Sequence, residues 1–120
     1  MHLPEACDVL APDGSEVRVL LALDGASMAH FRLLPGQVSQ AVRHRTVGEI
    51  WYGLSGQGEM WRSDVGVVAL GPGVCLTIPV GVAFQFRTLG DVPLDVVGVT
   101  VPPWPGPEEA EPAVGAWDGS

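Results

Sequence analysis

Apolar and polar residues alternate along short stretches of the chain, and turn-forming residues interrupt them every few positions. A period of two is the pattern of β-strands that bury one face. Pairs such as Asp24-Gly25 and Pro35-Gly36 supply the residues that tight turns need. The pattern therefore predicts an all-β protein with no stretch long enough for a helix. The expected strands span residues 16–23, 27–34, 38–43, 49–54, 57–62, 65–70, 74–78, 82–88 and 94–101.

The alternation stops at Pro102, where a proline-rich run gives way to an acidic stretch. This composition predicts an extended, polyproline-like tail and not a further strand. The tail also carries Trp104 and Trp117, and large aromatic side chains usually pack against something. We therefore expect a barrel domain over residues 1–101 and a docked tail over residues 102–120.

Length and charge limit the class of protein and its partners. A chain of 120 residues suffices for one domain. The net charge is -8, and every positive residue is an arginine. Four acidic residues lie in the tail, so the body keeps ten acids against six arginines, or -4. We expect no nucleic-acid partner and no membrane partner, and the best-fitting ligand is neutral or weakly charged.

The cysteines and the N-terminus indicate a reducing location. Cys7 and Cys75 are the only cysteines, and Cys75 lies in an apolar run where a buried free thiol is expected. No disulfide framework is implied. The first residues do not resemble a signal peptide, and no segment reaches membrane-spanning length, so the expected location is the cytoplasm.

Two segments resemble the two conserved motifs of the cupin family. The first runs from Gly36 through His44 and Glu49 to Gly56, and the second runs from Gly73 to Phe84 and contains Pro-x-Gly. The order and the spacing of the two motifs carry the resemblance, which covers about half of the chain. It implies a single-domain cupin β-barrel of the jelly-roll type, followed here by the Pro-rich acidic tail.

The metal ligands of this family are incomplete in the chain. Cupins typically hold a divalent ion with two histidines and a glutamate from the first motif and a histidine from the second. His44 and Glu49 match two of these positions, but Thr46 and Phe84 stand at the other two. A hydroxyl is a poor ligand for first-row metals and a phenyl ring is none. We therefore expect no native metal and no other cofactor.

The resemblance implies that His44 and Glu49 point into the barrel from neighbouring strands. A carboxylate beside an imidazole raises the imidazole pKa and fixes its tautomer, which gives a general acid or base without a metal. These two residues are the candidate catalytic pair. The chemistry that suits such a pair is isomerisation, cyclisation or elimination.

Alternation along the strands suggests a pocket around this pair. Trp51 and Gly53 share a face with Glu49, and the glycine is expected to open space or to let a ligand approach the backbone. Phe84 and Phe86 share another face and predict an aromatic wall. The alternative is that these aromatic side chains only fill the core. The candidate substrate-binding residues are Thr46, Trp51, Gly53, Phe84 and Phe86.

These features predict a metal-free cupin, expected to be a homodimer, that binds a small apolar or aromatic molecule and acts on it through the His44–Glu49 pair. One alternative is a non-catalytic ligand-binding or sensory cupin in which the pair only orients a ligand. Another is a metal-dependent cupin of the oxygenase type whose missing ligands come from water, Thr46 or the substrate. The sequence leaves open whether the protein is an enzyme, and it does not name a substrate.

Overall fold

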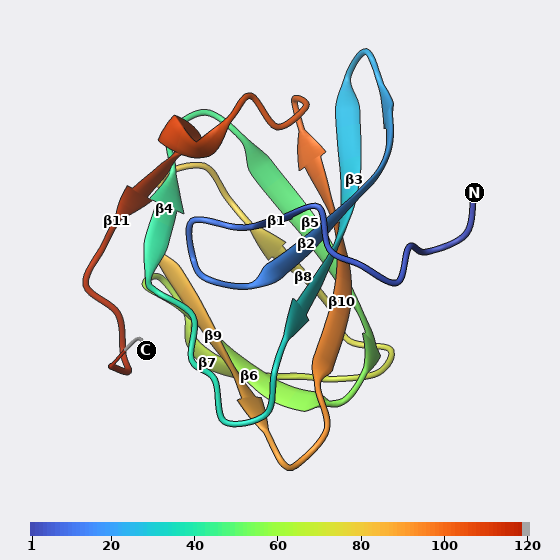
Figure 1. Cartoon of the computed structure of the whole chain (residues 1–120). Coiled ribbons are helices and arrows are strands. Elements are labelled where there is room, and N and C mark those ends of the chain that lie inside the picture. Colours follow the sequence, from blue (N-terminus) through green and yellow to red (C-terminus); the bar gives the residue numbers. More distant parts are fainter. Residues whose placement is uncertain (119–120) are drawn as a thin grey trace.

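The computed structural model describes residues 1–118, and its regular structure is almost entirely β-strand (Figure 1). This confirms the predicted all-β class. No helix within residues 1–118 is long and apolar enough to cross a membrane. The strands are β1 (Val9–Leu10), β2 (Glu16–Leu23), β3 (Ala26–Leu33), β4 (Val42–His44), β5 (Gly48–Ser55), β6 (Gln57–Arg62), β7 (Gly66–Leu70), β8 (Cys75–Ile78), β9 (Phe84–Leu89), β10 (Leu94–Val101) and β11 (Ala110–Pro112), with a short 3-10 turn, η1 (Pro107–Glu109).

Two antiparallel sheets face each other and form the barrel (Figure 1). The larger sheet has the strand order β1-β2-β3-β10-β5-β8, and the smaller has the order β11-β4-β9-β6-β7. Side chains from the two inner faces pack together, as the period of two requires. The resulting core contains Leu33, Val42, Trp51, Met60, Leu70, Ile78, Phe84, Phe86, Leu94 and Val96.

The strand predicted over residues 38–43 is shorter than expected. Only Val42–His44 forms a ladder, and Val38 makes an isolated bridge to Arg87. The reason is Ser39, whose side-chain oxygen accepts a hydrogen bond from the Phe86 N–H at 3.0 Å. The Ser39 hydroxyl thus accepts a hydrogen bond that a backbone carbonyl would accept in a regular strand ladder. Regular pairing begins only after this residue.

Cys75 is exposed, so the expectation of a buried thiol was wrong. Strand β8 lies at the edge of the larger sheet and pairs with β5 alone. Ile78 is buried inside the barrel. Because side chains alternate along a strand, Thr77 and Cys75 lie on the outer face. An apolar run at a sheet edge therefore does not imply burial on both faces. Cys7 is a free thiol as well.

The N-terminal hairpin, which the sequence did not predict, contributes a loop to the barrel interior. Strand β1 pairs with β2, and residues 11–15 turn between them. Asp13 Oδ1 accepts hydrogen bonds from the Ser15 N–H at 2.9 Å and from the Ser15 hydroxyl at 2.6 Å. The Gln40 N–H donates to the Asp13 carbonyl oxygen at 2.9 Å, which ties this loop to the segment before β4.

The tail is docked, as its tryptophans predicted, but it also forms a strand, which the sequence analysis had excluded. Strand β11 pairs with β4, with Ala110 opposite His44. It occupies the edge of the smaller sheet, where the missing N–H of Pro112 costs no ladder hydrogen bond. Trp104 packs edge-on against the His44 ring, with centroids 5.1 Å apart.

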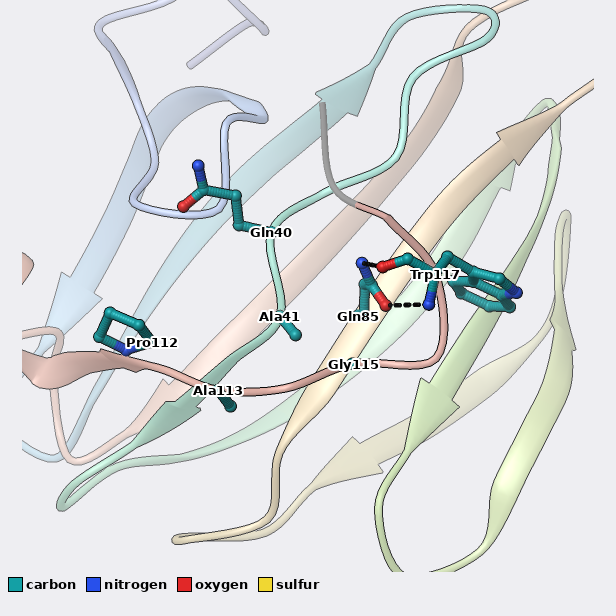
Figure 2. Close-up of a pocket in the computed structure, with 7 residues that line it drawn as sticks. All are labelled: Gln40, Ala41, Gln85, Pro112, Ala113, Gly115 and Trp117. Carbon is teal, nitrogen blue, oxygen red and sulfur yellow. Dashed lines mark hydrogen bonds between the residues drawn. The ribbon is translucent and has the colours of Figure 1, made fainter.

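The end of the tail is held by the side chain of Gln85 (Figure 2). The Gln85 amide accepts from the Trp117 N–H at 2.9 Å and donates to the Trp117 carbonyl oxygen at 2.7 Å. Arg87 lies over the Trp117 ring at 4.2 Å from its centroid. Gly115 allows this close approach, since a Cβ there would lie 2.2 Å from Gln85 Oε1. The small pocket of about 230 Å³ beside these residues has no ionisable side chain in its lining.

Candidate functional site

A cavity of about 700 Å³ lies between the two sheets, with a mostly apolar lining. The smaller sheet contributes His44 and Phe84, and the larger sheet contributes Glu49 and Trp51. The N-terminal loop adds Asp13 and the tail adds Trp104. This volume lies in the range of ordinary ligand pockets.

His44 and Glu49 meet inside the cavity. His44 Nδ1 lies 3.4 Å from Glu49 Oε1, and both side chains are 4% exposed. Their hydrogen-bond geometry is poor, so the buried His44 Nδ1 has no hydrogen-bond partner within residues 1–118. Because Nδ1 faces the carboxyl group, Nε2 is the ring nitrogen left for a ligand.

Trp51 positions the glutamate. Its indole Nε1 donates to Glu49 Oε2 at 2.5 Å, which is possible because the two residues lie two positions apart on the same face of β5. Gly98 lies opposite Trp51 on β10, and a Cβ there would lie 2.8 Å from the indole nitrogen. This glycine makes room for the indole, and a glycine in the middle of a predicted strand is the signal that points to it.

Burial decides the charge state of the pair. It lowers the pKa of His44 to about 4, although the Glu109 carboxylate acts in the opposite direction. It raises the pKa of Glu49 to about 7, against the Trp51 hydrogen bond and with support from the Asp13 carboxyl group. The expectation that Glu49 raises the pKa of His44 is therefore not met, because burial keeps the glutamate itself neutral. Between these two pKa values His44 is neutral and Glu49 carries a proton.

Aromatic rings surround the histidine. Phe84 packs edge-on against His44 with ring centroids 5.1 Å apart, and Trp104 does so from the tail side. Trp51 stacks on Phe31, with centroids 5.4 Å apart. The sequence predicted an aromatic wall from Phe84 and Phe86. Of these two, only Phe84 lines the cavity, and the wall is completed by Trp51, Phe31 and Trp104.

The structure places the other three candidate substrate-binding residues outside the cavity lining. Thr46 is exposed, and its hydroxyl donates to the Glu109 carboxylate at 2.7 Å. Phe86 lies behind Trp51 in the core, with ring centroids 5.0 Å apart. Gly53 opens no space for a ligand, because the backbone of Gly71 fills it: a Cβ on Gly53 would lie 1.9 Å from the Gly71 carbonyl oxygen.

Asp13 is the main cavity residue that sequence reasoning missed. Its side chain is buried, and burial raises its pKa against the hydrogen bonds from Ser15. An aspartate followed by a glycine is typical of an exposed turn, so the local sequence holds no signal for its burial. Trp104 was expected to dock, but nothing in the sequence indicated where.

Glu109 holds the tail against the loop that follows His44. Its carboxylate accepts hydrogen bonds from the Thr46 N–H and hydroxyl and from the Val47 N–H. Burial opposes the charged form, but these hydrogen bonds outweigh it and hold the pKa of Glu109 below its usual range. Their stabilisation is therefore fully present above the ordinary pKa of 4.5 and is lost as the pH falls through the lowered value.

Glu109→Ala should lower the free energy of unfolding by about 2 kcal/mol, because it leaves two backbone N–H groups without their acceptor. Chemical denaturation at neutral pH measures this. Glu108→Ala is the matched control, since the neighbouring glutamate is exposed. Equal stability of the two variants would contradict the role assigned to Glu109.

The cavity does not fit a transition metal. No group of three or more His, Cys, Asp or Glu side chains in residues 1–118 is arranged to hold an ion. Thr46 is engaged with Glu109, and the phenyl ring of Phe84 lies beside His44. A catalytic metal site needs about three protein ligands, and the family's ligand positions here supply two.

The cupin family model, described as "Cupin domain", matches residues 29–100. This is more than half of the chain, and the chain therefore belongs to the cupin family. The predicted cupin β-barrel of jelly-roll type is thus confirmed. No curated protein is similar enough in sequence to count as a match.

Solved structures share the fold at low sequence identity. Ectoine synthase from P. lautus superposes with a TM-score of 0.73 at 20% identity, covering 98% of this chain and 91% of its own. KdgF from Halomonas sp. has a TM-score of 0.67 at 17% identity, covering 74% and 81%. An uncharacterized conserved protein with a double-stranded β-helix domain from Klebsiella pneumoniae has a TM-score of 0.66 at 22% identity, covering 73% and 76%.

Proposed function

We propose that this cupin binds a small, largely apolar molecule in the cavity and acts on it by metal-free acid–base chemistry through His44 and Glu49. The observation that carries the proposal is the neutral imidazole 3.4 Å from a carboxyl group that keeps its proton up to a pKa of about 7. The neutral imidazole can accept a proton and the protonated carboxyl group can donate one, so neither group has to change its protonation state before the reaction.

The chemistry that fits this pair is a proton shift within one substrate. His44 Nε2 takes a proton from the bound molecule, and Glu49 gives its own proton to another atom of that molecule. A proton then passes from His44 Nδ1 to Glu49 Oε1, 3.4 Å away, and restores the starting charge state of the pair. The result is an isomerisation, or a cyclisation or elimination if a bond closes or breaks at the same time. The apolar walls support such a step, because they exclude water that would compete for the proton. The name of one structural neighbour, ectoine synthase, supports an enzymatic use of this fold.

Mass spectrometry of the full chain, purified without chelator, tests the proposal. We expect a small organic molecule to be bound under native conditions and elemental analysis to find transition metal far below one ion per chain. About one Fe, Mn, Ni, Cu or Zn per chain would contradict the metal-free site. If the bound molecule is recovered unchanged after prolonged incubation over a wide pH range, a binding or sensory role replaces catalysis.

Phe84→His should convert the cavity into a metal site, because Phe84 lies beside His44 within the lining and stands at a ligand position of the cupin motif. The new imidazole would complete a set of two histidines and a carboxylate, as in non-haem iron and zinc sites. Isothermal titration with Co²⁺ should then show about one strong site per chain where the natural protein shows none. Thr46→His is the matched control and should add no site, since Thr46 lies outside the cavity lining. Strong binding by the natural protein would contradict this account.

A further inference from the structure

Two buried carboxyl groups in the cavity have no positive partner. Asp13 and Glu49 both line it, and they are 8% and 6% exposed. Asp13 Oδ1 is occupied by Ser15, and Glu49 Oε2 by Trp51. Glu49 Oε1 faces the imidazole of His44 at 3.4 Å, and the Nδ1 atom of that ring has no hydrogen-bond partner within residues 1–118. Carboxyl groups buried in this way are costly to ionise unless a cation approaches them.

The protein does not supply that cation. The chain contains no lysine, and no arginine lines the cavity within the described residues. The arginines with charged or carbonyl partners are used elsewhere: Arg18 at the carbonyl oxygens of Pro4 and Glu5, Arg32 at Asp95, Arg45 at Glu111, Arg62 at Asp64 and Arg87 at Glu59. Arg43 is exposed. His44 is the remaining basic group of the cavity, and burial keeps it neutral above a pKa of about 4.

The rest of the lining also suits a cation with an apolar body. The rings of Phe31, Trp51, Phe84 and Trp104 all contribute to the cavity wall. Aromatic faces attract ammonium groups, and they do so most strongly where water is excluded. The buried His44 Nδ1, which has no hydrogen-bond partner within residues 1–118, shows that the polar groups of this cavity are not satisfied by the protein alone.

We propose that the cavity takes an organic cation, that is, a protonated amine or a quaternary ammonium group carried on a small apolar or aromatic body. This inference rests on the proposed function, since it names the class of ligand for the same cavity. Above the Glu49 pKa of about 7, one ammonium group offsets the charge of one of the two carboxylates, Asp13 and Glu49, and the apolar body packs against the rings. Carboxylate and phosphate ligands are disfavoured, because they would meet two acidic groups and no positively charged one.

Three probes with the same phenyl-ethyl skeleton separate charge from shape. They are 2-phenylethylamine, 2-phenylethanol and phenylacetate, which are cationic, neutral and anionic at pH 8. Their binding to the full chain is followed by isothermal titration and by quenching of tryptophan fluorescence, since Trp51 and Trp104 line the cavity. We expect the amine to bind about 10- to 30-fold more tightly than the alcohol, and phenylacetate to bind least.

Asp13→Asn and Glu49→Gln test the source of that preference. Each removes one carboxyl group at nearly constant shape, so each should reduce the difference in affinity between 2-phenylethylamine and 2-phenylethanol. Asp91→Asn is the matched control, because it removes one negative charge at an exposed turn outside the cavity. This control should leave the difference in affinity between the amine and the alcohol as it is in the natural protein.

The outcomes separate this inference from the proposed function. If the alcohol or phenylacetate binds as tightly as the amine, the cation inference is overturned, while the cavity stands as a binding site for small apolar molecules. A preference for the amine that Asp91→Asn reduces as much as Glu49→Gln reflects only the overall charge of the protein and also overturns it. If none of the three probes binds, the cation inference is overturned, while the proposed function is decided separately by the native mass spectrometry of the purified chain.

Discussion

Replacing His44 with alanine should slow turnover of the cavity's substrate by about two to four orders of magnitude, the usual contribution of a general acid or base. The imidazole is the neutral proton acceptor of the site, and its Nε2 is the nitrogen left free by the contact with Glu49. Turnover is followed on the molecule recovered from the purified protein. His30→Ala is the matched control, because His30 is a second buried histidine that pairs with Asp95 at 2.9 Å outside the cavity lining.

The control variant, His30→Ala, should be less stable but should keep its turnover per folded molecule.

Glu49→Gln adds a second readout, since it removes the group whose pKa is about 7. The inflection near pH 7 in the pH–rate profile should then disappear, which a loss of binding alone would not cause. Full activity of His44→Ala would show that the proton transfers occur elsewhere.

Gly53→Ala should prevent stable folding or lower the free energy of unfolding by more than about 3 kcal/mol. A methyl group there would lie 1.9 Å from the Gly71 carbonyl oxygen. The two chain segments have little freedom to separate, because the Gly53 N–H donates to the Val74 carbonyl at 2.9 Å and the Gly73 N–H donates to the Gly53 carbonyl at 3.0 Å. Soluble yield and chemical denaturation measure the effect.

Gly25→Ala is the control for this substitution. A Cβ at Gly25 meets no atom within 4 Å, and its backbone does not adopt a positive φ. Its free energy of unfolding should therefore change by less than about 0.5 kcal/mol. If both variants are equally stable, Gly53 is not needed for the close approach of Gly71, and the claim that it opens a ligand space would regain support.

Local patterns predicted the strands well because one face of each is buried, and a period of two records that burial directly. The prediction was wrong where a single side chain or a sheet edge decided the outcome. The Ser39 side chain replaces a ladder acceptor before β4, and Pro112 is tolerated at the edge in β11. Cys75 faces outward on β8, at an edge of the other, larger sheet.

The candidate site was partly predictable for a similar reason. Motif spacing and alternation placed His44, Glu49, Trp51 and Phe84 on inward faces, and the structure brings these four together. Asp13 and Trp104 enter the cavity from segments far from the motifs, which no local pattern indicates. Thr46 was assigned by its position in the motif, but the hydrogen bonds to Glu109 turn its hydroxyl to the tail. The homodimer and the cytoplasmic location stay predictions.

The central claim is that burial leaves a neutral histidine beside a protonated glutamate, and an NMR titration of the two side chains tests it most directly. The account predicts that the Glu49 carboxyl carbon titrates near pH 7 and that the His44 ring stays neutral down to a pKa of about 4. Both transitions should be absent from the matching variants, Glu49→Gln and His44→Ala. A Glu49 carboxyl that titrates at its ordinary pKa of 4.5, beside a His44 ring that protonates at 6.5 or above, would contradict it.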